Sequence, residues 1–596
     1  MRELSVPSKA PNPRQHNTAD YVFENAAAFP ERVALRRRID GDWRDVTSAA
    51  FAAEVLDLAK GLIAVGVETG ERIALMSKTR YEWTLIDFAV LSIGAVVVPV
   101  YETSSAEQVE WILSDSGAKA IFVETEAHEA TVESVRESAV AGLSVWRIEG
   151  DALSDLVARG ADLTDDQAHK RREAVTPSDL ASILYTSGTT GRPKGCQLLH
   201  LNFITEVSEV TVELRHLFNE DTSTLLFLPI AHVFGRVIEI GALASGCTLG
   251  HTADVKNLLP DLAAFQPTFV LSVPRVFEKV YNTAKQRAHA DGKGKIFDIA
   301  ERIAIRYSQA LDSGHVPLPL KLQHAVFDRL VYGKLRAALG GRCIAAISGG
   351  APLGARLGHF FRGVGLTIYE GYGLTETTAG ICVNRPDALR IGTVGRPVGG
   401  TAARVADDGE LLFKSNLVFA GYWHNDSATA DAIDPDGWFH TGDIGAIDED
   451  GFVRITGRKK ELIVTAGGKN VAPAVLEDRV RAHWLVSQCL VVGDRQPFIA
   501  ALVTIDPEAF PSWLEKVGRP ATTNLADVVD DPELRAEVQS AIDDANKAVS
   551  KAEAIRKFTI LPIDWTEATG QLTPSMKLKR AVVQKECAAE IAALYG

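Results

Sequence analysis

The chain has 596 residues, which is too long for one hydrophobic core, so two or more domains are expected. Its formal net charge of −14 argues against nucleic acid as the main partner, because a surplus of acidic residues implies no basic face. The six cysteines are scattered without a Cys-x-x-Cys pair, which argues against a disulfide framework or a structural zinc site and fits a reducing cytoplasm.

No segment has the pattern of a secretory signal or a membrane-spanning helix. The first residues, Met-Arg-Glu-Leu-Ser-Val-Pro, lack an apolar core. The most apolar run, from Phe88 to Val100, is too short to cross a bilayer and predicts a buried helix followed by a strand. We therefore expect a cytoplasmic protein, and contact with the inner face of a membrane stays open.

Apolar strand-like runs and amphipathic helical stretches alternate over about the first 450 residues. Strand-like runs lie at 72–76, 95–100 and 120–123, and a helical pattern lies at 106–114. Such alternation predicts parallel sheets covered by helices. Residues 161–178 are polar and charged, which is typical of a surface connection.

A loop rich in glycine and threonine follows a predicted buried strand at 180–185. Residues 185–195 read Tyr-Thr-Ser-Gly-Thr-Thr-Gly-Arg-Pro-Lys-Gly, which makes a poor helix and a poor strand. Its backbone N–H groups and hydroxyls can wrap phosphate oxygens, and its lysine adds a point charge. The spacing is not that of a Walker A loop, and a flexible linker seldom sits directly behind an apolar strand. The residues expected to bind phosphate are Thr186, Ser187, Gly188, Thr189, Thr190 and Lys194.

A long helical insertion is predicted over residues 276–340. Helical patterns lie at 295–306 and 327–338 within it. Taken alone, these patterns are equally consistent with a solvent-facing helical pair packed on the core.

We predict a domain boundary near Gly457 and Arg458. A hairpin over 448–456 precedes the boundary, with its turn at Asp450-Gly451. A large domain over 1–457 would thus be followed by a smaller α+β domain over 458–596. Its predicted strands include 489–492 and 500–505, and its predicted helices include 532–556.

The glycine-rich loop resembles the phosphate-binding signature of the adenylate-forming superfamily, which includes acyl-CoA synthetases, luciferases and peptide-synthetase adenylation domains. Further stretches resemble the other signatures of that superfamily and follow in its order. These stretches lie at 369–377, 438–443, 457–463 and 467–471. The resemblance covers nearly the whole chain, from about residue 20 to the C-terminus.

The resemblance implies an α/β multidomain fold. A large N-terminal domain would contain helix-covered, largely parallel sheets and a β-barrel-like subdomain, and a smaller, mobile α+β domain would follow it. The insertion at about 276–340 is similar to that of the long-chain fatty acyl-CoA synthetase branch, where it can wall an acyl tunnel or lie against lipid.

The reaction implied by the resemblance has two halves. A fatty acid of medium to long chain attacks the α-phosphate of ATP, with Mg²⁺ bound, and gives acyl-AMP and pyrophosphate. The thiol of coenzyme A then attacks the acyl carbonyl, and AMP leaves. Two alternatives stay open: a fatty acyl-AMP ligase that loads an acyl carrier protein, and a catalytically inactive nucleotide- or lipid-binding homologue.

The resemblance also assigns nucleotide contacts. Glu376 would hold Mg²⁺ at the triphosphate, because hard oxygen ligands suit that ion, and Thr375 would bond the α-phosphate. Tyr372 would offer a face to adenine, and Asp443 would accept hydrogen bonds from the ribose hydroxyls. Each assignment has a simpler alternative. Glu376 could be a solvated surface charge, Gly349-Gly350 could be a glycine pair in a loop, and Asp443 could be an aspartate in a turn. The remaining assigned residues are Gly349, Gly350, Ala351, Glu370, Gly371, Gly373 and Arg458.

The adenylation lysine is assigned to Lys577 by resemblance. The superfamily usually has glycine directly before this lysine, whereas this chain has Met576, so Lys579 and Arg580 stay as alternatives, as does a basic surface tail. His232 resembles the residue beside the acyl and pantetheine channel, although a structurally satisfied histidine is nearly as consistent with the sequence.

The small domain is expected to turn between the two half-reactions. By position the pivot of this hinge is Lys460. The turn would withdraw Lys577 and bring in the loop of Gly467, Gly468 and Lys469 to shape the coenzyme A channel. Glycine suits a backbone that must approach a narrow pantetheine arm.

Overall fold

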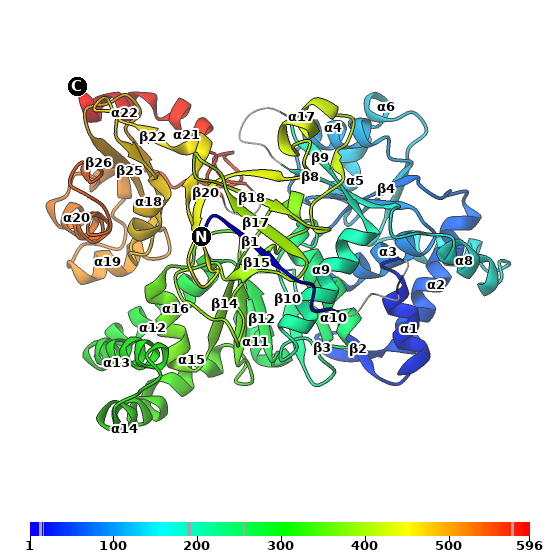
Figure 1. Ribbon diagram of the computed structural model, residues 1–596, viewed down its shortest axis with the longest axis horizontal. Helices are drawn as coiled ribbons and strands as arrows, with labels where there is room; N and C mark the ends of the chain where they lie inside the picture. The colour runs from blue at the N-terminus through cyan, green and yellow to red at the C-terminus, as the bar shows by residue number, and fades with distance from the viewer. Residues whose placement is uncertain (11–14, 16, 187–191, 254–256, 574–576) are drawn as a thin grey trace.

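The computed structural model describes residues 1–596 except 11–14, 16, 187–191, 254–256 and 574–576. A large N-terminal domain contains three sheets with helices packed on them, and a smaller C-terminal domain lies beside it (Figure 1). The predicted α/β multidomain fold is confirmed. Among the described residues, no helix has the length and apolar character needed to cross a membrane.

The sheet that carries the glycine-rich loop has seven strands in the order β19-β9-β8-β5-β4-β6-β7. Strands β8, β5, β4, β6 and β7 are parallel, whereas β9 is antiparallel to both β8 and β19. The bounds are β4 Arg72–Met76, β5 Val96–Val100, β6 Ala120–Val123, β7 Ser144–Arg147, β8 Leu180–Thr186, β9 Lys194–Leu199 and β19 Gly421–Tyr422.

A second sheet has nine strands in the order β16-β15-β14-β13-β12-β10-β11-β2-β3. Its central strands are parallel, and antiparallel pairs complete both edges. The bounds are β2 Val33–Ile39, β3 Asp42–Thr47, β10 Ser223–Leu226, β11 Thr248–His251, β12 Phe269–Ser272, β13 Ala345–Ser348, β14 Thr367–Tyr372, β15 Cys382–Val383 and β16 Arg396–Pro397.

The third sheet is antiparallel and corresponds to the predicted barrel-like subdomain, in the form of a half-barrel. Its order is β1-β17-β18-β20-β21, so it does not close on itself. The predicted hairpin near residue 450 is its β20–β21 pair. The bounds are β1 Glu3–Val6, β17 Thr401–Val405, β18 Glu410–Lys414, β20 Phe439–Ile447 and β21 Val453–Arg458.

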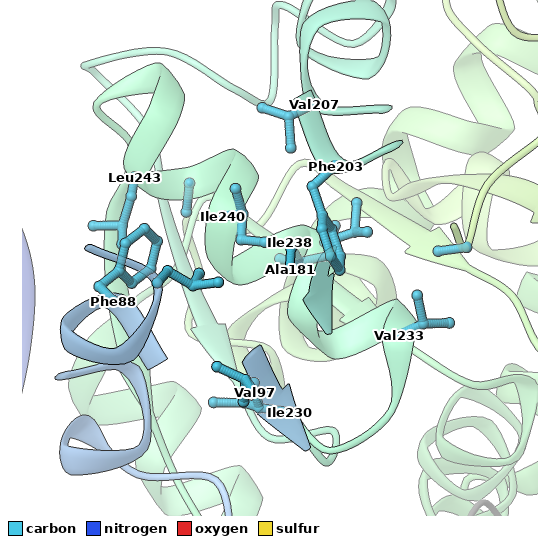
Figure 2. Packing of buried hydrophobic residues seen from close by; sticks show 14 of the residues in the cluster. Phe88, Val97, Ala181, Phe203, Val207, Ile230, Val233, Ile238, Ile240 and Leu243 are labelled. Carbon is cyan, nitrogen blue, oxygen red and sulfur yellow. The ribbon is translucent and has the colours of Figure 1, made fainter. Parts of the chain in front are cut away.

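Helices of the large domain cover these sheets. Helix α3 is buried along almost its whole length, which explains why its sequence is apolar on every side. Figure 2 shows its Phe88 packed in the core that also holds Val97 of β5 and Phe203 of α9. The bounds are α1 Asp20–Ala28, α2 Ser48–Ala64, α3 Tyr81–Ser92, α4 Ala106–Ser116, α5 Glu126–Glu133, α6 Arg136–Ala139, α7 Ala152–Arg159, α8 Asp165–Glu173, α9 His200–Glu213, α10 Val233–Ser245, α11 Leu258–Phe265, α16 Ala355–Val364 and α17 Asp426–Ala432.

The region predicted as an insertion is helical apart from short connections at 291–293, 313–317 and its end. The pattern at 327–338, predicted as one helix, is interrupted by a π-helical turn over Asp328–Tyr332. These helices lie at one edge of the large domain, below the small domain in the view of Figure 1. The bounds are α12 Pro274–Ala290, α13 Gly294–Asp312, α14 Leu318–Phe327 and α15 Gly333–Ala338.

The small domain has its own apolar core, around a three-stranded sheet in the order β24-β25-β26. The bounds are β22 Ile463–Val464, β23 Asn470–Val471, α18 Pro473–Arg481, β24 Val486–Val492, β25 Ile499–Ile505, α19 Phe510–Lys516, α20 Pro532–Asn546, β26 Ile555–Ile560, α21 Arg580–Glu586 and α22 Ala588–Tyr595.

The helix predicted over 532–556 was too long. Helix α20 ends at Asn546, and strand β26 begins at Ile555. The side-chain amide of Asn546 both accepts from the Ile555 backbone N–H, at 2.8 Å, and donates to its carbonyl oxygen, at 3.0 Å. These two bonds fix the turn between helix and strand, which helical periodicity does not reveal.

Candidate active site

The predicted phosphate loop joins the antiparallel strands β8 and β9. Thr186 and Lys194 lie opposite each other at the open end of this hairpin, and the Thr186 hydroxyl lies 3.5 Å from the Lys194 carbonyl oxygen. The stem is held by the Tyr185 hydroxyl, which donates to Asp115 at 2.6 Å. The remaining predicted phosphate ligands, Ser187, Gly188, Thr189 and Thr190, lie outside the described residues.

Glu376 lies beside this hairpin, where it accepts a hydrogen bond from Tyr422, a residue that the sequence did not single out. The Tyr422 hydroxyl donates to Glu376 Oε1 at 2.8 Å, and Lys194 Nζ lies 4.8 Å from the centre of the Tyr422 ring. Tyr422 thus separates a carboxylate from a cation at the mouth of the loop. The only local sequence signal for Tyr422 is the aromatic pair that follows Gly421. Tyr422 reaches the loop because its strand, β19, pairs with β9.

The backbone after Glu376 has an uncommon conformation. Thr378 and Ala379 both have positive φ, at 54° and 83°. A Cβ on Gly373 would lie 1.4 Å from the Ala379 carbonyl oxygen, so only glycine fits there. The buried Glu206 of α9, also missed, accepts a hydrogen bond from the Gly380 N–H at 3.0 Å. Strain of this kind is commonly found at functional sites.

Asp443 and Arg458 are opposite residues of the β20–β21 hairpin. Arg458 Nε lies 3.0 Å from Asp443 Oδ1, and the Tyr372 hydroxyl donates to Asp443 Oδ2 at 2.5 Å. Burial raises the pKa of the Asp443 carboxyl, and the charge of Arg458 opposes this effect. Three residues predicted to contact the nucleoside are therefore brought together.

Glu410, which the sequence did not single out, supports this group from β18. Its Oε1 accepts from the Gly442 N–H at 2.8 Å, and its Oε2 lies 3.0 Å from Lys459 Nζ. Glu410 is buried, so these bonds fix the turn that presents Asp443. A lone glutamate in a strand carries no sequence signal for this role.

The predicted adenine wall follows strand β13. A Cβ on Gly349 would lie 3.0 Å from the Phe234 ring, and Gly350 has φ +80°, so this turn favours glycine. The Glu370 side chain is directed to the neighbouring loop, where its Oε1 accepts from the Leu353 N–H at 3.1 Å. Burial raises the pKa of Glu370 to about 7.

His232 serves as the N-cap of α10. Its Nδ1 accepts from the Phe234 N–H at 3.2 Å. Burial, and secondarily the charge of Lys577, lowers the pKa of His232 to about 4, so the imidazole is neutral at pH 7. The residue is thus held structurally and also lines the cleft described below.

Lys577 extends from the small domain toward Asp443 and Glu376. The Thr573 N–H donates to the Lys577 carbonyl at 2.8 Å, and Leu572 pairs with Leu578. Lys577 keeps an exposed surface, but the protein groups around it remove water, and this loss of hydration, with the charge of Arg458, lowers its pKa; Asp443 and Glu376 act in the opposite direction.

The alternatives to Lys577 are placed differently. Arg580 is bound within the small domain, where its Nη1 lies 2.6 Å from Glu477 Oε1 and its Nη2 donates to the Val491 carbonyl at 2.9 Å. Lys579 is at the N-cap of α21, and both Lys579 and Arg580 border the same cleft as Lys577. The assignment of Lys577 as the adenylation lysine therefore stays a prediction.

One cleft of about 3570 Å³ joins these groups, and both domains line it. Thr186, His232, Glu376 and Lys577 all border it. Apolar and charged side chains together line it along α9, α10 and the insertion. Apolar lining residues there include Val210, Val237, Phe297, Leu335, Ile347 and Val383.

The predicted hinge residue borders the cleft, whereas the predicted coenzyme A loop lies elsewhere. Lys460 is exposed in a turn over Lys459–Glu461, next to Lys459, whose Nζ pairs with Asp408 and Glu410. Gly467 and Gly468 lie in an exposed turn outside the cleft lining, where Lys469 Nζ is 3.4 Å from Glu553 Oε1.

The fold and this cleft are those of an adenylate-forming enzyme, with residues of a large and a small domain lining the cleft. The chain belongs to the AMP-binding enzyme family, whose model matches residues 22–423. The model of the AMP-binding enzyme C-terminal domain matches residues 460–596.

Relatives with known names agree with this assignment. The long-chain-fatty-acid–CoA ligase FadD15 of Mycobacterium tuberculosis is 54% identical, with both chains covered completely. The human long-chain-fatty-acid–CoA ligase 1 is 30% identical over 93% of this chain and 82% of its own. The adenylation domain of a carboxylate reductase from Mycobacterium chelonae, 23% identical, shares the fold with a TM-score of 0.74 over 98% of this chain and 92% of its own.

Proposed function

We propose that this enzyme converts a fatty acid of medium to long chain to its coenzyme A thioester, with ATP cleaved to AMP and pyrophosphate. The observation that carries the proposal is one large cleft whose lining includes Thr186, Glu376 and Lys577 together with many apolar side chains. An apolar pocket with a few placed polar groups is typical of a site for a largely apolar ligand.

In the first half-reaction, a carboxylate oxygen of the fatty acid attacks the α-phosphate, and pyrophosphate leaves. Two anions must meet, so the protein's task is to place positive charge and donors rather than to supply a nucleophile. Lys577 approaches Glu376 from the small domain, and Lys194 lies against Tyr422, whose hydroxyl donates to Glu376. Thr186 and Thr375 would add hydroxyl donors to phosphate oxygens.

Glu376 would hold Mg²⁺ at the triphosphate, where the ion would neutralise phosphate charge. The donor set fits this ion, since Mg²⁺ usually takes one or two protein carboxylates and fills its shell with water and phosphate oxygens. Among the described residues, no group of three or more His, Cys, Asp or Glu side chains is placed to hold a metal. One carboxylate beside a phosphate loop therefore suits a metal that arrives with its nucleotide.

The nucleoside would be held by Asp443, Arg458 and Tyr372. Asp443 would accept from the ribose hydroxyls, and Arg458 would reach the same sugar. The Tyr372 ring would lie against adenine, opposite the backbone of Gly349, Gly350 and Ala351. Gly371 and Gly373 would let this strand approach the nucleotide closely.

In the second half-reaction, the thiol of coenzyme A attacks the acyl carbonyl and AMP leaves with the C–O bond electrons. We propose that the small domain, residues 458–596, turns about Lys460 to allow this step. Lys577 would leave the cleft, and Gly467, Gly468 and Lys469 would line the pantetheine channel. His232, neutral at working pH, would border the acyl carbonyl without adding a charge.

We also propose that the insertion rests on an anionic lipid surface. Leu318, Leu322, Val326 and Leu330, four residues apart, follow one helical face and are 69%, 62%, 56% and 53% exposed. Large apolar side chains gathered on one exposed face are typical of an interaction site. We call these four residues the apolar stripe.

The charge of the insertion supports a lipid partner. Residues 274–338 hold twelve Lys and Arg against six Asp and Glu, whereas the whole chain has a net charge of −14. Basic residues around an apolar helical face favour an anionic membrane surface. Leu330 also borders the cleft, so the apolar stripe leads from this surface toward the acyl region.

The first test is AMP release with ATP, Mg²⁺ and coenzyme A over saturated fatty acids from acetate to stearate. We expect release that rises with chain length and requires coenzyme A. Pyrophosphate release without a coenzyme A requirement would favour a ligase that loads a carrier protein instead. No turnover with any acid, together with no ATP–pyrophosphate exchange, would favour an inactive homologue.

A further inference from the structure

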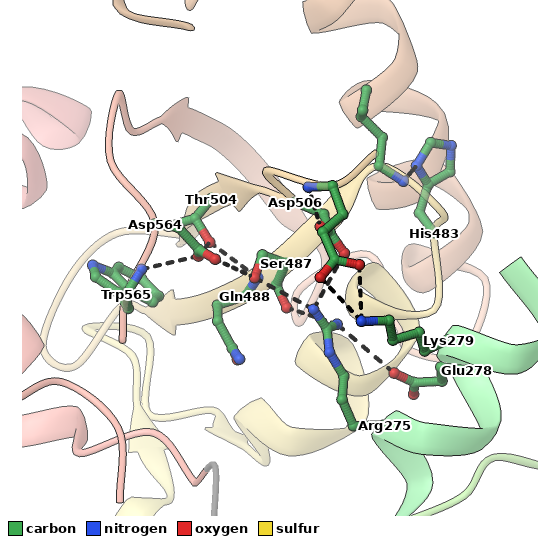
Figure 3. A network of polar contacts seen from close by, with 12 residues as sticks. Arg275, Glu278, Lys279, His483, Ser487, Gln488, Thr504, Asp506, Asp564 and Trp565 are labelled. Carbon is green, nitrogen blue, oxygen red and sulfur yellow. Dashed lines mark hydrogen bonds and ion pairs between the residues drawn. The ribbon is translucent and has the colours of Figure 1, made fainter. Parts of the chain in front are cut away.

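Two basic side chains of helix α12, Arg275 and Lys279, contact the small domain. Arg275 Nη1 donates to the Ser487 carbonyl at 3.2 Å, and its Nη2 lies 3.5 Å from Asp506 Oδ2. One turn later, Lys279 Nζ lies 2.8 Å from Glu508 Oε2. Figure 3 shows both side chains reaching from α12 to the small domain.

Ser487 is in turn linked to the segment that precedes Lys577. Its hydroxyl donates to Asp564 Oδ2 at 2.7 Å, and it also lies 3.4 Å from Arg275 Nη2. The other oxygen of Asp564 accepts from the Trp565 N–H at 2.9 Å (Figure 3). Arg275 of α12 is therefore hydrogen-bonded to Ser487, which is linked through Asp564 to the backbone of Trp565.

Trp565 continues this connection to the Lys577 turn. It is buried and belongs to the same apolar cluster as Leu572 and Leu578. Those two leucines pair with each other, and Leu578 directly follows Lys577 in the chain. A continuous set of contacts thus runs from α12 to the base of the adenylation lysine.

We propose that Arg275 and Lys279 are positioning residues for acyl-AMP formation, holding the small domain so that Lys577 faces the cleft. This inference rests on the proposed function and on the proposed turn of the small domain. Both contacts cross from one domain to the other, so a turn that withdraws Lys577 must break them. Their side chains are partly exposed, and ion pairs of that kind are weak enough to break in each turnover.

Separate assays of the two half-reactions distinguish a positioning role of Arg275 and Lys279 from a purely structural role. We expect Lys279→Glu, which sets like charges against each other at Glu508, to slow fatty-acid-dependent ATP–pyrophosphate exchange by about 10- to 100-fold, the scale of a small misplacement of reacting groups. Thioester formation from supplied acyl-AMP should change by less than about twofold, because it does not need Lys577 in the cleft. Arg275→Ala should show the same split.

Exchange of charge provides the decisive control. The double variant K279E/E508K restores the ion pair with reversed polarity and should return pyrophosphate exchange to within about threefold of wild type. Lys516→Glu alters a lysine that pairs with Glu537 inside the small domain, and should leave both half-reactions unchanged. An equal fall of both half-reactions, or no recovery in the double variant, would overturn the proposal.

A second measurement does not depend on activity. A zero-length carbodiimide should join Lys279 to Glu508 in the wild-type enzyme, and mass spectrometry of the digest should find that crosslinked peptide. Its absence would also overturn the proposal. A wild-type enzyme that gives the crosslink but forms no acyl-AMP would instead refute the proposed function, so the two failures are distinguishable.

Discussion

Asp443 illustrates how single side chains at this site are prepared before any nucleotide binds. Both carboxylate oxygens already have protein partners, Tyr372 on one side and Arg458 on the other. A carboxylate has about four acceptor positions, so ribose hydroxyls can join without displacing these partners. The protein has thereby fixed the orientation of the group that would read the sugar.

At this same scale, Lys577→Ala tests the adenylation lysine. We expect acyl-AMP formation to fall by roughly 10²–10³, because one positioned donor to the transition state is lost. Thioester formation from supplied acyl-AMP should be largely spared. Single-turnover assays of each half-reaction measure this split.

Lys579→Ala serves as the matched control for Lys577, since it removes the same charge two residues away. It should leave both half-reactions near the wild-type rate. A larger loss in Lys579→Ala than in Lys577→Ala would mean that the lysine is misassigned.

Among the elements, α3 and α10 are joined by a fully buried ion pair. Arg236 pairs with Asp87 and donates from Nη1 to the Ser182 hydroxyl at 2.5 Å. We expect Asp87→Ala to lower the free energy of unfolding by about 3–5 kcal/mol, because it leaves a buried guanidinium without its partner. Chemical denaturation of the full chain measures the change.

The exposed pair of Arg2 and Asp407 is the control for this buried one. Asp407→Ala should change stability by less than about 0.5 kcal/mol, since exposed ion pairs contribute little. Similar losses in Asp87→Ala and Asp407→Ala would contradict the role given to burial.

The apolar stripe of the insertion gives a second prediction for an element. The triple variant L318S/L322S/V326S should weaken binding to anionic phospholipid vesicles by about 10- to 100-fold, because burying one apolar side chain contributes roughly 1 kcal/mol or more. Cosedimentation measures the binding. Turnover of a detergent-dispersed fatty acid should stay near wild type, since the three substituted residues are not among those that line the cleft.

Val157→Ser provides the comparison for the stripe, because it removes an exposed apolar side chain from a helix that is not part of the insertion. Equal vesicle binding by the wild type and the triple variant would refute the proposed surface. So would an equal loss in the Val157 variant.

For the whole molecule, buried histidines couple stability to pH. His200 is fully buried and its Nδ1 accepts from the Thr18 N–H at 3.0 Å. Burial lowers the pKa of His200 to about 3, below the usual value near 6.5. The unfolded chain therefore binds a proton between these pH values that the folded chain does not, so this contribution is full above about pH 6.5 and is lost as pH falls.

His200→Asn should reduce this dependence. The variant should be less stable than the wild type at pH 7, but the difference should shrink by on the order of 1 kcal/mol per pH unit below pH 6. Urea denaturation at pH 7, 6 and 5 measures it. Glu370 acts in the opposite direction, since its raised pKa favours the folded state at lower pH, so the comparison must be made between variants. A difference that is constant with pH would contradict the prediction.

Much of the fold could be predicted from local sequence patterns. The phosphate hairpin, the buried α3 and the β20–β21 turn each have a signal within a few residues. The end of α20 was missed because it depends on one side chain bonding to residue 555. The predicted roles of the site residues remain predictions for the assays proposed above.

The supporting residues could not be found in the same way. Tyr422, Glu410 and Glu206 act on groups that lie far away in sequence, and each is an ordinary residue type in an ordinary element. Arg275 reaches Ser487 across 212 residues. Such pairs become visible only when the packing of several elements is known.

The pairing of strand β1 with β17 also determines when its sheet can form during synthesis. Its partner β17 lies about 400 residues later, since Glu3 pairs with Arg404. On a ribosome that adds about 5–20 residues per second, β1 must wait on the order of 20–80 s for that partner. The sheet that carries Asp443 is therefore completed late. Most nascent chains on the ribosome will lack the proposed ribose-binding group and will present an open strand edge to chaperones or to each other.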